Sequence, residues 1–454
     1  MAAVRTIDRA RLAALQEREE AAFVAAHPRS ADLHRRARGS LLAGVPMPWM
    51  SEWAGAFPVF VDRAKGARFT DVDGNTYVDL CLGDTGAMTG HAPDAVLRAL
   101  ADRAPAGITT MLPGEDAIAV GEELARRFGL PAWQFCLTAT DANRFAIRTA
   151  RALTGRPKIL VFSWCYHGSV DETIAITDGG RVVSRPGSIG PPVDPALTTR
   201  VVEFNDLEAL ERELAHGDVA AVLTEPALTN IGIVLPEPGF HEGLRDLTRR
   251  AGSLLIIDET HTICAGPGGA TRAWGLEPDL FTIGKPLASG IPAACYGMSA
   301  EVAARAEAFL RTLPSTDVGG VGGTLSGNAL SLAAMRATLE EVLTDDAFAR
   351  MIALGGRWAD GARDAIERHG LPWEVQRLGC RAEYWFTPTP PRNGGEAAAA
   401  GDGDLARFVH LYALNRGILL TPFHNMALMC PATTEDDVDL HTRVFDAMAA
   451  ELVA

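Results

Sequence analysis

One lysine stands out as a residue that could do chemistry. Only three of the 42 basic residues are lysines (Lys65, Lys158 and Lys285), so arginine fills nearly every position where a simple cation would serve. A sheltered lysine can lose its proton and attack a carbonyl carbon, whereas arginine stays protonated. Lys285 follows the apolar segment DLFTIG and precedes small residues that let a ligand approach the backbone, which makes it the candidate nucleophile.

Two adjacent carboxylates end a run of apolar residues in LLIIDETHT, residues 254–262. An unpaired carboxylate in such a buried place would cost several kcal/mol, so we expect Asp258 to face a cation. The alternative is that Asp258 caps a helix and Glu259 points to water.

A third candidate group is the segment Thr138-Ala139-Thr140, which follows an apolar run and precedes a helix that we expect to begin at Asp141. Free N–H groups at a helix start, together with two hydroxyls, suit a phosphate. The alternative is an ordinary N-cap.

Further polar and aromatic residues follow other expected strands: Tyr166 and His167 after one, and Glu225 and Asn230 after another. Each could be a packed ring or a turn cap. Together with Lys285 they satisfy the requirements of pyridoxal 5′-phosphate: the amine binds the aldehyde carbon as an imine, the helix start holds the phosphate, Tyr166 stacks on the pyridine, and Asp258 keeps the ring nitrogen protonated.

The elements that must position these residues alternate along the chain. Apolar runs of strand length separate amphipathic helices from about residue 114 to 283, which predicts an α/β fold with a mostly parallel sheet covered on both faces. Ligands of such sheets collect at the carboxyl ends of the strands. Residues 67–80 predict a hairpin with DGN as its turn.

We expect three parts: an N-terminal segment (1–65; a surface helix plus part of a small domain), a large cofactor-binding domain (66–330), and a C-terminal α/β small domain (331–454) that includes the flexible tract PRNGGEAAAAGDGD. The net charge of −15 argues against nucleic acid or an anionic membrane as partner. Seven scattered cysteines without a C-x-x-C pair fit reduced thiols, so we expect a cytoplasmic protein.

The segment LLIIDETHT…GLEPDLFTIGKPLASGIPAACYG resembles the class III (subgroup II) pyridoxal-phosphate-dependent aminotransferases, in their glutamate-1-semialdehyde aminomutase-like branch. YHG at Tyr166 and GGTLSGN at 322–328 resemble motifs of the same family. The resemblance implies fold type I, a homodimer with shared active sites, Lys285 as the Schiff-base lysine and Asp258 beside the ring nitrogen. It also implies that Thr324 binds the phosphate held by the other subunit.

The sequence departs from the family pattern at two places. Thr138-Ala139-Thr140 stands where the family usually reads S-G-T, which keeps a hydroxyl but adds a methyl group. Thr260 and His261 stand where Val and then Gln or Met are usual. His261 could pack under the ring or hydrogen-bond its 3-oxygen.

Substrate choice is interpreted from absent arginines. Many relatives bind a carboxylate through an arginine in stretches that correspond here to 45–57 and 421–430, and neither stretch contains one. Aromatic and apolar residues stand there instead, with His424 as the nearest cation; the substrate-pocket candidates are Trp49, Trp53, Phe423 and His424. We therefore expect an aminotransferase that moves an amino group from a hydrophobic or aromatic amine, or a β-amino acid, to a small oxo acid such as pyruvate. The alternative for these side chains is dimer packing.

Other functions share this scaffold. An aminomutase would move the amino group within one captive substrate, and the absent N-terminal arginine argues against it; consumption of an oxo acid would exclude it. A racemase or decarboxylase would leave no pyridoxamine form. A cofactor-binding regulatory protein is the alternative outside enzymes, and no basic patch supports it.

Overall fold

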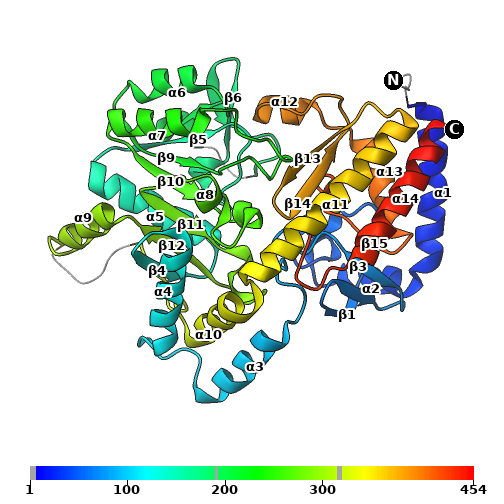
Figure 1. Cartoon of the computed structure of the whole chain (residues 1–454), viewed down its shortest axis with the longest axis horizontal. Helices are drawn as coiled ribbons and strands as arrows, with labels where there is room; N and C mark the ends of the chain where they lie inside the picture. The colour runs from blue at the N-terminus through cyan, green and yellow to red at the C-terminus, as the bar shows by residue number, and fades with distance from the viewer. Residues whose placement is uncertain (1–6, 190–192, 314–319) are drawn as a thin grey trace. The chain divides into compact units, whose positions relative to one another are not determined.

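The computed structural model describes residues 7–189, 193–313 and 320–454, which fold into two compact units (Figure 1). The terminal unit combines the described residues up to Pro93 with Asp346–Pro390 and Ala400–Ala454. The central unit combines Asp94–Asp345 with Pro391–Ala399. The three-part division expected from the sequence stays a prediction.

A seven-stranded sheet forms the middle of the central unit, in the order β4-β12-β11-β10-β9-β5-β8. β10 pairs in parallel with β9 and β11, and β5 pairs in parallel with β8 and β9, whereas β12 runs antiparallel to β11 and β4. The mostly parallel sheet predicted from the sequence is therefore confirmed. The bounds are Ala132–Cys136 (β4), Lys158–Phe162 (β5), Thr199–Val202 (β8), Val219–Thr224 (β9), Leu254–Asp258 (β10), Leu280–Ile283 (β11) and Ala294–Met298 (β12), beside a separate hairpin of Ala175–Asp178 (β6) and Arg181–Ser184 (β7).

Helices cover this sheet (Figure 1) because they present small and apolar side chains to it. α5 contacts β9, β11 and β12, and its buried face includes Ala142, Ala146 and Ala150. The helices of the central unit are Asp94–Arg103 (α3), Glu115–Phe128 (α4), Ala139–Thr154 (α5), Leu207–Leu214 (α6), Phe240–Ala251 (α7), Gly269–Ala273 (α8), Ala300–Leu310 (α9), Ala329–Ala337 (α10) and Gly394–Ala399 (α12).

Three local expectations need correction. α5 begins at Ala139 rather than Asp141, because the Thr138 side chain accepts the Asp141 N–H and closes the first turn two residues earlier. β12 was expected only as a run of small residues near a ligand, yet it is a fully buried strand. The tract expected to be flexible contains α12, where Gly394 packs so closely on Ser163 that a Cβ would overlap the Ser163 carbonyl oxygen.

The terminal unit contains two small sheets and long helices. Antiparallel pairing of β2 with β3 confirms the predicted hairpin. The sheets are β1-β2-β3-β15 and β13-β14-β16, with bounds Val61–Lys65 (β1), Arg68–Asp71 (β2), Thr76–Asp79 (β3), Glu374–Leu378 (β13), Arg381–Trp385 (β14), Ile418–Leu419 (β15) and Met426–Leu428 (β16). The helices are Arg9–Ala26 (α1), Pro28–Ala37 (α2), Asp345–His369 (α11), Gly403–Leu414 (α13) and Glu435–Val453 (α14).

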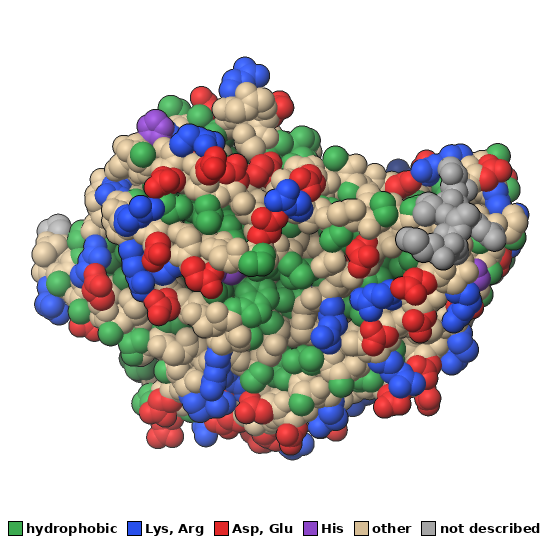
Figure 2. All heavy atoms as spheres, turned by 45° about the horizontal axis from the view of Figure 1, so that its top comes forward, with side chains coloured by type: hydrophobic (Ala, Val, Ile, Leu, Met, Phe, Trp, Pro, Cys, Tyr) green, Lys and Arg blue, Asp and Glu red, His purple; other side chains and the backbone are tan. Residues whose placement is uncertain are grey.

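The charged side chains on the surface are of mixed sign, and the cysteines lie inside the protein. Figure 2 shows Lys and Arg side chains interspersed with Asp and Glu on the face drawn. All seven cysteines are buried and free. Among the described residues, no helix is both long and apolar enough to cross a membrane.

Phe23 ties the N-terminal helix α1 to the terminal unit. Its side chain is fully buried in a cluster with Phe69, Tyr77, Leu411 and Leu414. The neighbouring Val24 on the same helix is 47% exposed. The first helix is therefore part of a core and not only a surface segment.

Phe23→Ala should lower the free energy of unfolding by about 3–5 kcal/mol, because it removes a buried ring and leaves a cavity. Urea denaturation followed by tryptophan fluorescence measures the change. Val24→Ala is the matched control and should change the free energy by less than about 0.5 kcal/mol. Equal effects of the two substitutions would contradict this packing.

Candidate functional site

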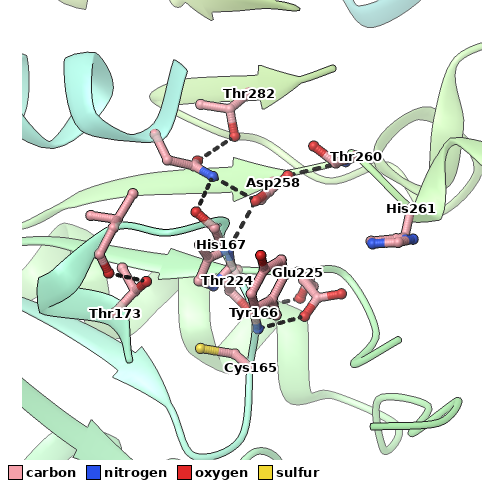
Figure 3. Close-up of polar contacts among 12 residues, drawn as sticks. Cys165, Tyr166, His167, Thr173, Thr224, Glu225, Asp258, Thr260, His261 and Thr282 are labelled. Atoms are coloured by element: carbon pink, nitrogen blue, oxygen red, sulfur yellow. Dashed lines mark hydrogen bonds and ion pairs between the residues drawn. The ribbon is translucent and has the colours of Figure 1, made fainter. Parts of the chain in front are cut away.

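Asp258 is the last residue of β10 and is only 3% exposed. Its Oδ2 accepts hydrogen bonds from Asn143 Nδ2 at 2.8 Å and from His167 Nδ1 at 2.9 Å, and its Oδ1 accepts one from the Thr260 N–H at 3.1 Å (Figure 3). Three donors from three different elements thus converge on one buried carboxylate.

These donors keep Asp258 ionised. Burial raises the pKa of Asp258, but the hydrogen bonds and the charge of His167 outweigh it and hold the pKa below its usual value. Burial lowers the pKa of His167, whereas Cys165 and Asp258 raise it well above its usual value. The two side chains form a buried ion pair, so His167 is a cation that faces Asp258. The contact of Asp258 with the ring nitrogen of a cofactor stays a prediction.

Asn143 and Thr282 belong to this network and were not predicted. Thr282 Oγ1 donates to Asn143 Oδ1 at 2.7 Å, which orients the amide so that its nitrogen faces Asp258 and the His167 carbonyl oxygen. The sequence did hold a signal: Asn143 is a polar residue on the apolar face of α5, and it is fully buried there.

Tyr166 and Glu225 are also brought together. The Tyr166 N–H donates to Glu225 Oε1 at 3.4 Å, and Thr229 Oγ1 donates to Glu225 Oε2. Burial raises the pKa of Glu225 to about 7. Tyr166 is 40% exposed, so its ring is accessible for stacking. Asn230 is half-buried in the same loop, in an isolated bridge with Gly232.

The start of α5 lies against the turn that carries Tyr166. Thr140 Oγ1 accepts the Ser169 N–H at 3.1 Å, and a Cβ on Gly168 (φ 76°) would overlap the same oxygen. Only glycine permits this approach. Thr138 Oγ1 accepts the Asp141 N–H and donates to its carboxylate at 2.8 Å, so this hydroxyl serves as the N-cap. Ala139 is the first residue of the helix, where N–H groups lack intrahelical partners.

Lys285 follows β11 at the start of a short 3₁₀ turn, Lys285–Ala288, with a φ of 26°. A lysine with positive φ is strained, and such strain concentrates at functional sites. Its Nζ lies 2.8 Å from His261 Nε2. His261 is 4% exposed. Its contact with the amine of Lys285 was not among the roles expected from the sequence, which were packing under the ring or a hydrogen bond to the 3-oxygen.

The residues of the central unit fit pyridoxal phosphate. The cofactor has an aldehyde, a ring nitrogen and a phosphate, and the unit offers a strained lysine, a buried ionised carboxylate and the start of a 16-residue helix. The partly exposed ring of Tyr166 adds a stacking surface.

The remaining predicted residues lie elsewhere in the chain. In the terminal unit, the rings of Trp49 and Phe423 meet edge to face with centroids 6.4 Å apart, and both are about half exposed. Trp53 is half-buried, and the buried His424 faces Glu383 Oε1 at 3.1 Å. In the central unit, Thr324 is exposed before α10. Their contacts with substrate or phosphate stay predictions.

The family model for class III aminotransferases matches residues 49–449, so the chain belongs to this family. It is a pyridoxal-phosphate-dependent enzyme of fold type I, as the sequence predicted.

Individual relatives narrow the family. A solved glutamate-1-semialdehyde-aminomutase from Pseudomonas aeruginosa PAO1 is 54% identical, covers 98% of this chain and 99% of its own, and superposes with a TM-score of 0.96. A second structure of that enzyme, in which one lysine is changed to alanine, is a complex with PMP and also superposes with a TM-score of 0.96. The glutamate-1-semialdehyde 2,1-aminomutases of Sorangium cellulosum and Anaeromyxobacter dehalogenans strain 2CP-1 are 37% and 34% identical, over 91% and 90% of this chain and 94% and 95% of their own.

The expected transfer from a hydrophobic amine to a separate oxo acid is wrong, because these relatives are aminomutases. That interpretation depended on the absence of arginine from residues 45–57 and 421–430. The absence is real, but a carboxylate can be bound by a cation from any part of a fold. Aromatic side chains in the two stretches therefore do not define an aromatic substrate.

Glu259, beside Asp258, is fully buried rather than directed to water. Its carboxylate accepts hydrogen bonds from Thr271 Oγ1 at 2.6 Å and from the Thr271 N–H at 3.3 Å. Burial raises the pKa of Glu259 from 4.5 to about 7, because hydrogen bonds from Thr271, Ala270 and Thr262 only partly offset the loss of water.

The raised pKa of Glu259 predicts a pH-dependent stability. The folded protein binds this proton more tightly than the unfolded chain, so the stabilisation is complete below pH 4.5 and is lost as the pH rises through about 7. Glu259→Gln should remove roughly 2 kcal/mol of the decrease in unfolding free energy that the wild-type protein shows between pH 5 and pH 7.5. Urea denaturation at pH 5 and pH 7.5 measures the difference, and the exposed Glu242→Gln is the control, which should keep the wild-type pH dependence.

Proposed function

We propose that this chain is a glutamate-1-semialdehyde 2,1-aminomutase. The reaction moves the amino group of glutamate 1-semialdehyde from carbon 2 to carbon 1 and leaves a ketone on carbon 2. The observation that carries the proposal is the 54% identity to the Pseudomonas aeruginosa enzyme over nearly the whole of both chains. Because the amino group stays on one carbon skeleton, the reaction needs no external oxo acid.

Three residues of the central unit carry the proposed chemistry. Bound pyridoxal phosphate supplies a carbon that exchanges amino groups and a ring that stores the electrons of a broken C–H bond. Asp258, kept ionised by His167, holds a proton at the ring nitrogen. Lys285 removes a proton from one carbon and returns it to another, which requires its neutral amine at the start of the step.

Arg185 is the residue that we propose to bind the substrate's carboxylate. It follows β7, is half-buried, and donates from Nη1 to the Cys165 carbonyl oxygen at 3.3 Å. The guanidinium carbon lies 5.1 Å from the centroid of the Trp164 ring. Burial lowers the pKa of Arg185, while Cys165, Tyr166 and Glu225 raise it in part; arginine nevertheless remains charged at any working pH.

This placement compensates for the arginines absent from residues 45–57 and 421–430. Arg185 contacts the residue next to Tyr166, the ring proposed to stack on the cofactor. A partly desolvated guanidinium presents a planar pair of donors that matches a carboxylate. Glutamate 1-semialdehyde keeps the side-chain carboxylate of glutamate, so its polar end has a partner of opposite charge.

The proposal includes a homodimer with shared active sites. Thr324 supports it, because this residue is exposed on the segment 322–328 rather than packed against the Asp258 network of its own chain. Small-molecule substrates of the aminotransferase family are the partners that the family membership establishes.

Purified enzyme should convert glutamate 1-semialdehyde to its isomer without added oxo acid, and Lys285→Ala should reduce the rate at least about 10³-fold because the base is lost. Chromatographic measurement of the product tests this. Lys158→Ala, which removes another of the three lysines, is the control and should retain activity. Stoichiometric consumption of pyruvate, or no isomer at all, would contradict the proposal.

Arg185→Ala should raise KM for glutamate 1-semialdehyde about 10- to 100-fold, the range expected when a charged hydrogen bond to a substrate is lost. Arg185→Lys should recover part of this loss, since it keeps the charge but not the planar fork. Steady-state kinetics measure both. Arg181→Ala, on the same hairpin but exposed, is the control. An unchanged KM in Arg185→Ala would show that the carboxylate is bound elsewhere.

A further inference from the structure

We propose that His261 is a positioning residue for Lys285: its neutral imidazole accepts a hydrogen bond from the Lys285 ammonium and stabilises the protonated amine that forms during proton transfer. The observation that carries this is the 2.8 Å distance between Lys285 Nζ and His261 Nε2. The role rests on the proposed function, in which Lys285 is the base.

His261 lies in a segment whose backbone is held by hydrogen bonds on both sides of it. The Glu259 N–H donates to the Thr282 carbonyl oxygen at 2.9 Å, and the Thr260 N–H donates to Asp258. The Cys264 N–H donates to the His261 carbonyl oxygen at 3.3 Å, at the start of the 3₁₀ turn Thr262–Ala265. The imidazole is therefore positioned by the same strand end that carries Asp258.

The backbone around Lys285 is also constrained. Its backbone has a positive φ, which an ordinary lysine avoids, and the preceding Gly284 lies against the start of α5. A Cβ at Gly284 would lie 3.2 Å from the Ala139 nitrogen. The contact between Lys285 and His261 therefore joins two side chains whose backbones are both constrained.

Charge and proton balance fit a neutral His261. An ammonium is a donor only, so the imidazole must accept through an unprotonated Nε2 and carry its proton on Nδ1. When Lys285 takes a proton from a carbon it becomes an ammonium, and when it returns the proton it becomes an amine again. His261 gains and loses no proton in this cycle; it stabilises only the charged form.

The three lysines of the chain make this directly measurable. Acylation of amines by an N-hydroxysuccinimide acetate reagent requires the neutral amine, and peptide mass spectrometry can follow each lysine in the full-length protein freed of cofactor. Lys65 and Lys158 are internal references, because they donate to the carbonyl oxygens of Ala92 and Ala196, respectively.

His261→Phe keeps a ring of similar size but removes the acceptor, so Lys285 should be acylated about tenfold faster at pH 8, relative to Lys65 and Lys158. His261→Gln keeps an acceptor oxygen and should stay within about threefold of the wild-type protein. The two variants should also differ in kinetics. We expect kcat to fall about tenfold in His261→Phe with KM unchanged, and His261→Gln to keep most of the wild-type kcat.

A purely structural role of His261 would change Lys285 acylation equally in both variants, and no role would leave both at the wild-type rate; either result overturns the proposal. If His261→Phe does not fold, as judged by circular dichroism, His261→Leu replaces it with the same expected acceleration. Failure of the aminomutase assignment is separate, since it would appear as an inactive wild-type enzyme while the acylation difference persists.

Discussion

The structure of the site depends on one interaction, the buried ion pair between Asp258 and His167. A carboxylate that is 3% exposed is tolerable only because Asn143, His167 and the Thr260 N–H supply three hydrogen bonds. His167 pulls the turn after β5 to the end of β10, and Asn143 ties α5 to the same point. The pair therefore fixes where the aromatic ring, the helix start and the acid lie relative to one another.

The sheet makes this convergence possible. β10 lies between β9 and β11 in parallel register, so Asp258 stands beside Thr282, and Lys285 follows only three residues later. Carboxyl ends of adjacent parallel strands share one edge, which places an acid and an amine from distant sequence positions at one site. Lys285 lies two residues past the end of β11 with a positive φ, and its Nζ is 2.8 Å from His261 Nε2.

The sequence predicted what depends on local pattern and failed where tertiary contacts decide. Buried strands, the hairpin at 67–80 and the roles proposed for Lys285 and Asp258 follow from apolar runs and from scarce lysine. The start of α5 was misplaced because the segment holds two threonines, and only the folded chain shows that Thr138 makes the N-cap bond to the Asp141 N–H. Asn143 was missed since its partners come from three other segments, and no periodicity reports such a meeting.

The error about substrate has the same physical origin. The absence of arginine from two stretches, with His424 as the nearest cation, was interpreted as a pocket for a hydrophobic amine, although a fold can supply a guanidinium from any loop that reaches the site. Arg185, which we propose as the carboxylate-binding residue, directly follows β7, and the sequence did not indicate it because its contact with the Cys165 carbonyl oxygen exists only in the folded chain. Charge complementarity must therefore be judged over everything that surrounds a site. The position at which a relative has its arginine therefore does not decide whether this chain can bind a substrate carboxylate.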